Sequence, residues 1–129
     1  MLDVALLRRL SLLDPIAISG GNRLLTEFKG ALTENFVLQS LVQQFEGVPR
    51  YWKSENTAEV DFLVQYENMI VPIEVKSDEN VKSKSLALYR KTFNPERSIR
   101  YSLRNLKRDD DLINIPLFMI DHTKKILAM

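Results

Sequence analysis

The strongest helical pattern in the chain covers residues 33–45, TENFVLQSLVQQF. Leu38, Leu41 and Phe45 recur at helical spacing, and a glycine and a proline shortly afterwards end the pattern. Continuing this apolar stripe toward the N-terminus leads to Glu34, which is therefore expected in the first turn, facing the edge of the core. The helix dipole would favour its negative charge there. An ordinary N-terminal capping acid explains Glu34 equally well.

Two other segments have helical features. A short helix is expected over residues 3–13, with Asp3 as its cap and a proline after its end, and SGGN at 19–22 indicates a turn or loop. Residues 1–25 are thus interpreted as a leading helix and loop. Further along, residues 83–93 begin with a serine and mix apolar with basic side chains, which favours a helix.

The strand signals lie between and after these helices. Residues 48–53, VPRYWK, are predicted to form a first strand, and residues 59–76 a hairpin. In residues 98–104, SIRYSLR, apolar and polar side chains alternate, as in a strand with one buried face. The short apolar run IPLFMI at 115–120 is also assigned as a strand. The predicted order is two helices, three strands, a helix, a strand and a final short piece.

The hairpin can be read residue by residue if 67–68 forms a two-residue turn, because every cross-strand pair is then fixed. In this register Asp61 lies opposite Glu74, and Glu59 lies opposite Lys76. One face of the hairpin is apolar throughout and is predicted to face the core: Val60, Phe62, Val64, Tyr66, Met69, Val71, Ile73 and Val75. The other face carries the charges.

Paired carboxylates on neighbouring strands lie about 5 Å apart at Cβ and repel each other, so something must offset the repulsion. Mg²⁺ would do so, because it accepts one or two carboxylates while keeping waters and phosphate oxygens as ligands. Lys76, on the same strand as Glu74, could position a water or stabilise charge on a phosphate. Alternatively, the face is a surface ladder in which Lys76 only neutralises Asp61 and Glu74.

The distribution of charge changes this picture more than the net charge, which is only +1. Residues 54–80 contain seven acidic residues against one lysine, whereas residues 82–108 contain nine basic residues against one glutamate. An acidic centre beside a basic flank suits a metal site next to a phosphate track; two solvated faces are the simpler explanation. The basic residues predicted to contact nucleic acid are Lys82, Lys84, Arg90, Lys91, Arg100 and Arg104.

Composition places limits on the class of protein. The 129 residues, 45% hydrophobic and 27% charged, suit a single globular domain spanning 1–129. Without cysteine, neither disulfides nor thiolate metal sites can form, and a cytoplasmic location is expected. Arg8 and Arg9 interrupt the apolar N-terminal run, whereas a signal peptide needs an unbroken apolar centre. No apolar segment reaches transmembrane length. No membrane association is therefore expected.

Asp61 followed by Glu74-Val75-Lys76 resembles the PD-(D/E)XK signature of the restriction endonuclease-like nuclease superfamily, and Glu34 matches the acid on its preceding helix. More narrowly, DVALL, GALTENFVLQSL, YWKS, EVDFLV, PIEVKS and KSLALYRKTF look like a domain of unknown function found at the C-terminus of prokaryotic AAA-type ATPases. This similarity extends over residues 3–121.

The resemblance implies an α/β fold with a restriction endonuclease-like core, a mixed sheet with a central antiparallel hairpin flanked by helices. It also implies an AAA-type ATPase portion or partner, so we expect the chain to be the C-terminal part of a longer protein. The chain has no G-x-x-x-x-G-K-[ST] motif and cannot bind nucleotide in that manner. The helix after Lys76 lacks the glutamine that many active relatives pair with a tyrosine, although Tyr89 is present.

Two functional hypotheses follow, one for an enzyme and one for a protein without catalytic activity. In the first, Asp61 and Glu74 hold Mg²⁺ or Mn²⁺, Glu34 assists directly or through a water, Lys76 activates water, and the basic segment follows a DNA backbone. In the second, the domain is a catalytically inactive interaction module that binds protein, DNA or its own copy.

Three further features are given structural interpretations. Tyr51 and Trp52 could stack on a base, but core packing is the commoner role of such residues. His122 is interpreted as a surface or structural residue. The acidic residues within 108–112 are interpreted as a loop and not as metal ligands.

Overall fold

A computed structural model describes residues 23–46, 50–55, 58–77 and 83–129. These residues form a six-stranded mixed sheet in the order β1-β2-β3-β4-β6-β5. The strands are β1 (Arg50–Lys53), β2 (Glu59–Tyr66), β3 (Met69–Val75), β4 (Ser98–Ser102), β5 (Lys107–Asp109) and β6 (Leu112–Pro116). The helices are α3 (Arg23–Gln44), α4 (Lys84–Phe93), the 3₁₀ helix η1 (Leu117–His122) and α5 (Thr123–Leu127).

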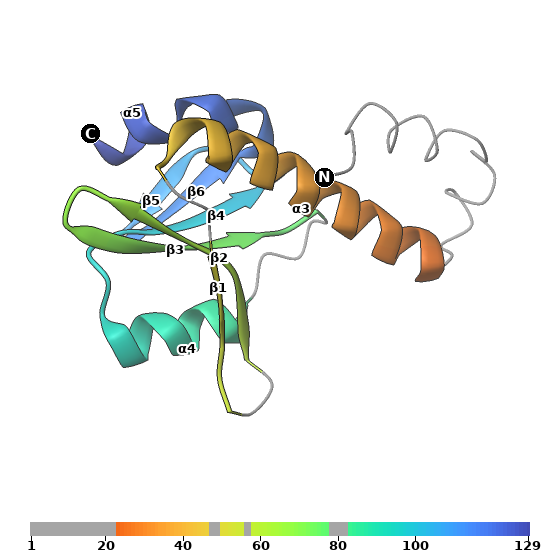
Figure 1. The fold of residues 1–129 in the computed structure, drawn as a ribbon, viewed down its shortest axis with the longest axis horizontal. Coiled ribbons are helices and arrows are strands. Elements are labelled where there is room, and N and C mark those ends of the chain that lie inside the picture. Colours follow the sequence, from red (N-terminus) through yellow and green to blue (C-terminus); the bar gives the residue numbers. More distant parts are fainter. Residues whose placement is uncertain (1–22, 47–49, 56–57, 78–82) are drawn as a thin grey trace.

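Helices cover both faces of the sheet (Figure 1). α3, η1 and α5 lie on one face, and α4 lies on the other. The pairs β1–β2, β2–β3 and β5–β6 are antiparallel, whereas β3–β4 and β4–β6 are parallel. The fold is therefore α/β with a central antiparallel hairpin, as the sequence predicted. None of the described helices is long and apolar enough to span a membrane.

The main core joins α3 to the sheet and to the C-terminal helices. Its buried members include Val37 and Leu41 of α3, Ile73 of β3, and Ile99 and Tyr101 of β4. Each of these five side chains has a relative exposure of 0%. Burying apolar side chains of this size stabilises a fold by roughly 1.5–3 kcal/mol each, so this layer fixes α3 over the β3–β4 part of the sheet.

α3 differs from the helix expected at 33–45 because it begins at Arg23, well before Thr33. Glu34 therefore lies in the middle of the helix, and both the dipole argument and the capping argument for this residue are wrong. The sequence did carry a signal for the extra turns, because Leu25, Phe28 and Leu32 recur at helical spacing. The expected leading helix and the loop at 19–22 lie outside the described residues; residues 23–25 of that segment belong to α3.

The hairpin register is confirmed from Phe62 to Tyr66, whereas the predicted pairs Asp61–Glu74 and Glu59–Lys76 lie beyond the observed ladder. Tyr66 pairs with Met69, Val64 with Val71, and Phe62 with Ile73, as a two-residue turn requires. Glu67, the first turn residue, has a positive φ of 53°. The predicted helix at 83–93 is also confirmed as α4, with the Ser83 side chain accepting a hydrogen bond from the Leu86 N–H as its N-cap.

Two strand predictions need correction. The strand predicted at 98–104 is buried on both faces, since Ser98 and Ser102 are as fully covered as Ile99 and Tyr101. Their hydroxyl groups donate hydrogen bonds to Asp111 and Asn114, which allows polar side chains to be buried. The apolar run at 115–120 is strand only to Pro116 and continues as the 3₁₀ helix η1. A short apolar run does not distinguish these conformations.

The segment at 108–112 forms the end of β5, a turn and the start of β6, with Asp110 at a positive φ of 52°. Asp111 accepts two hydrogen bonds from Arg90 and one from Ser98. This segment therefore joins α4 to the sheet through a charge-assisted pair, a structural role that agrees with the interpretation of a turn and not a metal site.

A buried hydrogen bond links the sheet to the C-terminal helices. Tyr101 Oη lies 2.6 Å from Thr123 Oγ1, and Thr123 donates to the Ile120 carbonyl oxygen. Because Thr123 Oγ1 uses its proton on Ile120, the Tyr101 hydroxyl is the donor of the first bond. Both side chains have 0% exposure, so neither can turn to water.

Replacing Thr123 with valine should lower the free energy of unfolding by about 1–3 kcal/mol, because the Tyr101 hydroxyl would remain buried without an acceptor. Urea denaturation followed by circular dichroism measures this loss. Thr92→Val is the matched control, since Thr92 bonds to the Leu88 carbonyl on the exposed side of α4 and should change stability by less than about 0.5 kcal/mol. Equal losses in the two variants would contradict the structural role of Thr123.

Candidate functional site

The acidic part of the site is formed where β2 and β3 separate. The last pair of their ladder is Phe62 with Ile73, so Asp61 lies just beyond it. There the Asp61 Oδ2 atom accepts a hydrogen bond of 2.8 Å from the Val75 N–H. Further along, the Lys76 N–H donates to the Tyr101 carbonyl oxygen of β4. The Asp61 carboxylate thus replaces a backbone acceptor for β3 at the point where the β2–β3 ladder ends, while the other edge of β3 stays paired with β4.

An irregularity in β2 accompanies this separation. Arg50 of β1 pairs with Leu63, whereas Trp52 pairs with Val60. Two residues of β2, at 61–62, therefore face Tyr51 alone on β1, which is the arrangement of a β-bulge. Figure 1 shows that β2 bends: its first half runs with β1 away from the sheet, and its second half joins the hairpin. The bulge places Asp61 at the bend.

Glu74 is the most deeply buried acid of the group, with a relative exposure of 6%. Its Oε1 atom lies 3.8 Å from Lys76 Nζ, and the Lys76 side chain is 30% exposed. Its Oε2 atom is buried and has no hydrogen-bond partner among the described residues. A buried carboxylate oxygen without a partner is costly, so this atom marks a position where a cation or a proton donor would be stabilised.

The pKa of Asp61 is raised to about 6, mainly because burial disfavours its charged form. The hydrogen bond from Val75 lowers the pKa, the negative charges of Glu34 and Glu74 raise it, and Lys76 lowers it. Glu34, Glu74 and Lys76 therefore each lie within electrostatic reach of Asp61.

Glu34 lies near Asp61 from the middle of α3, and not from the end of a helix as predicted. Partial burial of its carboxyl group raises its pKa, and the negative charge of Glu59 adds to this. Glu59 donates its backbone N–H to Ser85 Oγ of α4. Within the described ranges, no three His, Cys, Asp or Glu side chains are grouped so that they could hold a metal ion together. Glu34 thus contributes negative charge beside Asp61, but no three-carboxylate centre is formed with it.

Asn114 is a polar residue of the site region that sequence reasoning missed. It lies on β6 opposite Arg100, and Arg100 lies on β4 opposite Glu74. Its Oδ1 atom accepts hydrogen bonds from Arg100 Nε at 3.1 Å and from Ser102 Oγ at 2.7 Å. The available signal was a single amide inside the apolar stretch LINIP, since a polar side chain there must have partners when buried.

The predicted nucleic-acid-binding residues have different surroundings. Arg90 forms a two-pronged ion pair with Asp111, at 2.6 and 2.8 Å, and is engaged within the protein. Lys84 and Lys91 lie exposed on α4. Arg100 is half-buried beside Glu74, Arg104 is exposed in the loop after β4, and Lys82 lies outside the described residues.

The two aromatic residues near the hairpin differ in their exposure to solvent. Trp52 is half-buried and packs edge-on against Tyr89 and Phe93 of α4, with ring centroids 5.3 and 5.9 Å apart, so it has a packing role without being fully buried. Tyr51 is 68% exposed. His122 is exposed at the end of η1.

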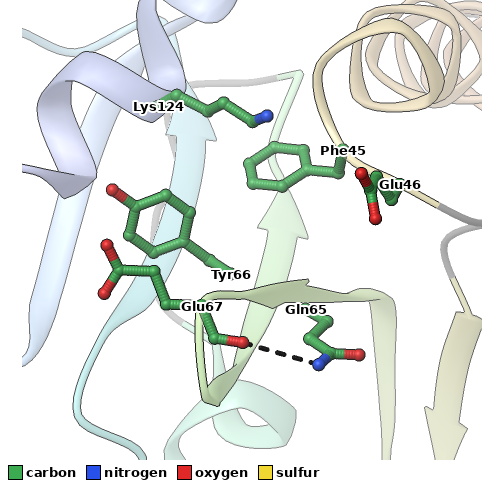
Figure 2. A pocket seen from close by; sticks show the side chains of 6 residues that line it. All are labelled: Phe45, Glu46, Gln65, Tyr66, Glu67 and Lys124. Atoms are coloured by element: carbon green, nitrogen blue, oxygen red, sulfur yellow. Dashed lines mark hydrogen bonds between the residues drawn. The ribbon is translucent and has the colours of Figure 1, made fainter.

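A pocket of about 400 Å³ lies at the other end of the hairpin, by its turn. It is lined by Phe45, Glu46, Gln65, Tyr66, Glu67 and Lys124 (Figure 2). Lys124 Nζ lies 5.4 Å from the centre of the Phe45 ring, in the range of a cation–π contact. None of the predicted site residues lines this pocket, so its chemistry is separate from that of Asp61 and Glu74.

Comparison with known proteins gives one family. The family model described as "Domain of unknown function (DUF4143)" matches residues 29–118. This range contains all four residues of the acidic site. A search of curated proteins found no significant match.

The raised pKa of Asp61 predicts how stability depends on pH. Between the ordinary Asp value of 3.8 and about 6, the folded protein holds more protons than the unfolded chain, so the free energy of unfolding falls as pH rises through this window. Asp61→Asn keeps an acceptor for the Val75 N–H and removes the charge. At pH 7, in EDTA, this variant should be more stable than the wild type by roughly 1–3 kcal/mol.

Urea denaturation between pH 4 and pH 8 measures this effect, with Asp110→Asn as the control. Asp110 is exposed at a turn with positive φ, which asparagine also tolerates. The control should follow the wild-type pH dependence. An Asp61→Asn curve that also followed the wild type would contradict the assigned pKa.

Proposed function

Because this chain belongs to the family described as Domain of unknown function (DUF4143), whose description gives no activity, we propose its function from the site: a metal-dependent DNA phosphodiesterase with a restriction endonuclease-like, PD-(D/E)XK type of core. The observation that carries this proposal is the buried Glu74 Oε2 atom, which has no hydrogen-bond partner in the described part of the chain, beside an Asp61 whose pKa is raised to about 6. Two carboxylates in this condition are stabilised by a cation.

Asp61 and Glu74 fit Mg²⁺ or Mn²⁺. Magnesium is usually held by one or two carboxylates, with waters and substrate phosphate oxygens completing the shell. Two carboxylates are therefore sufficient, and the missing three-acid group does not exclude such a site. When bound, the ion would polarise a phosphoryl oxygen and lower the pKa of a water molecule.

The chain's own residues supply the remaining functions. Glu74 Oε1 holds the ammonium group of Lys76 nearby, and the partly exposed ammonium group can orient a water molecule or stabilise negative charge on a phosphate. Asp61 is held by its bond to the Val75 N–H, so its free oxygen keeps one orientation. Glu34 strengthens the negative potential at Asp61. This potential attracts a cation, and a bound cation would in turn stabilise the charged form of Asp61.

DNA is the proposed substrate because the segment that follows the acidic hairpin in the chain exposes basic side chains. Lys84 and Lys91 on α4 and Arg104 after β4 are exposed, and phosphate contacts of this kind bind DNA without reading its sequence. The similarity of the sequence to domains that follow AAA-type ATPases supports an ATPase portion or partner that would deliver the DNA.

Two observations favour a second function. The described residues hold no group of three potential metal ligands, and α4 lacks the glutamine common in active relatives. A nuclease-like domain that has lost catalysis and serves as an interaction module would have these features. It would retain the fold and the basic surface without a working metal site.

Thermal unfolding with Mn²⁺ and cleavage of plasmid DNA separate these functions. A metal that binds only the folded state raises the melting temperature, so millimolar Mn²⁺ should stabilise the wild type but not Glu74→Gln. Cleavage by Glu74→Gln should fall roughly a hundredfold or more, since removing a metal ligand removes several kcal/mol of charge stabilisation. Glu96→Gln, an exposed glutamate away from the site, should match the wild type in both measurements.

The combination of results decides between the two functions. Stabilisation by Mn²⁺ together with cleavage that depends on Glu74 supports the enzyme. DNA binding without metal stabilisation or cleavage would overturn the phosphodiesterase proposal in favour of the interaction module.

A further inference from the structure

The pocket beside the turn of the hairpin, here called the hairpin-turn pocket, has an aromatic corner. The rings of Phe45 and Tyr66 line it and meet edge-on, with centroids 6.4 Å apart and planes at 80° (Figure 2). Phe45 belongs to the main core and is 5% exposed, whereas Tyr66 is half-buried against that core. Core packing therefore fixes the two rings in place.

The rim of the pocket is rich in hydrogen-bond acceptors. Glu67 in the hairpin turn and Glu46 after α3 line it with exposed side chains. The Gln65 Nε2 atom donates to the Glu67 carbonyl oxygen at 3.5 Å, which leaves the Gln65 amide oxygen available as a further acceptor. Only one lining residue, Lys124, carries a positive charge. A ligand that is positively charged and has several N–H donors therefore complements this lining.

Lys124 shows that the aromatic corner can hold a cation. Its Nζ atom lies 5.4 Å from the centre of the Phe45 ring, in a cation–π contact. Among the described residues, Lys124 forms no ion pair with Glu46 or Glu67. Lys124 is exposed on the short helix α5, so its side chain can move away. A cation that reached both the ring and the carboxylates would gain interactions that Lys124 does not make.

A guanidinium group fits this pocket better than an ammonium group or a metal ion. It is planar, so it can lie against an aromatic ring while its N–H groups donate to a carboxylate. The cavity of about 400 Å³ is far larger than a metal ion needs. A guanidinium group also has five N–H donors, which matches the several acceptors around the rim.

The openness of the pocket favours a side chain of another polypeptide as the source of this group. Four of the six lining residues are exposed, so a free small molecule would remain largely in water. Sites for small molecules usually bury most of their ligand. An arginine side chain needs only its end covered, because the rest of the partner polypeptide holds its backbone in place.

We propose that the hairpin-turn pocket binds an arginine side chain of a partner polypeptide. The guanidinium group lies in the aromatic corner and donates to Glu46 and Glu67, and it displaces the ammonium group of Lys124 from the Phe45 ring. This binding site is independent of the proposed phosphodiesterase function, because the pocket shares no residue with the acidic site.

Nuclear magnetic resonance of the ¹⁵N-labelled protein tests the site with N-acetyl-arginine amide, which carries the side chain on an uncharged, peptide-like backbone. The side-chain amide signals of Gln65 report binding, because Gln65 lines the pocket. These signals should shift and saturate at millimolar concentrations. N-acetyl-citrulline amide, which has a similar shape but no charge, should bind about tenfold more weakly. Free L-arginine should bind no more tightly than the capped form.

Substitutions on the rim should change the affinity in opposite directions. Glu46→Gln and Glu67→Gln keep the size of the side chain but remove a negative charge, and each should weaken binding about threefold. Lys124→Gln removes the competing ammonium group and should tighten binding about threefold. Lys125→Gln is the matched control, since Lys125 is exposed on α5 but does not line the pocket, and it should leave the affinity unchanged.

Several results would overturn the inference. Unchanged Gln65 signals, or equal binding of the citrulline compound, would show that the pocket does not recognise a guanidinium group. An unchanged or weaker affinity in Lys124→Gln would exclude competition with Lys124, and the weaker affinity would indicate an anion site. Tighter binding of free L-arginine would indicate a small-molecule site. An equal change in Lys125→Gln would reduce the effect to general surface charge.

Discussion

The hydrogen bond from the Val75 N–H to the Asp61 carboxylate is the interaction on which the site depends. A strand whose neighbour ends its pairing must find another acceptor for the N–H groups on that edge, because an unpaired buried group is costly. Here the acceptor is a carboxylate, which the β2 bulge brings to the junction. The same bond that completes the sheet thus places Asp61 within electrostatic reach of Glu74 and Lys76.

Charge at this junction is only partly balanced by the protein. Lys76 offsets Glu74, and Arg100 faces it from β4, yet the pKa of Asp61 remains raised and one oxygen of Glu74 has no described partner. The surrounding core is rigid because Ile73, Ile99 and Tyr101 are fully buried. Side chains on such a framework cannot move apart to relieve repulsion, which is the physical basis for proposing a cation between the acids.

Arg90 and Arg100 illustrate how basic residues close in sequence acquire different roles. Arg90 points from α4 to Asp111, and this pair attaches the helix to the sheet. Arg100 lies within the sheet itself, where Asn114 holds its guanidinium group. Their shared positive charge was visible in the sequence, but the partner of each was not, because Asp111 and Asn114 are brought near by the pairing of β6 with β4.

Elements that follow local rules could be predicted from the residues alone. Alternation along the hairpin and its two-residue turn fixed the register from Phe62 to Tyr66, because side chains alternate with a period of two. The position of Glu34 within α3, the burial of β4 on both faces and the hydrogen bonds of Asn114 became visible only in the folded protein. These features depend on contacts between segments distant in the chain, where hydrogen-bond partners and burial replace periodicity as the determining physics.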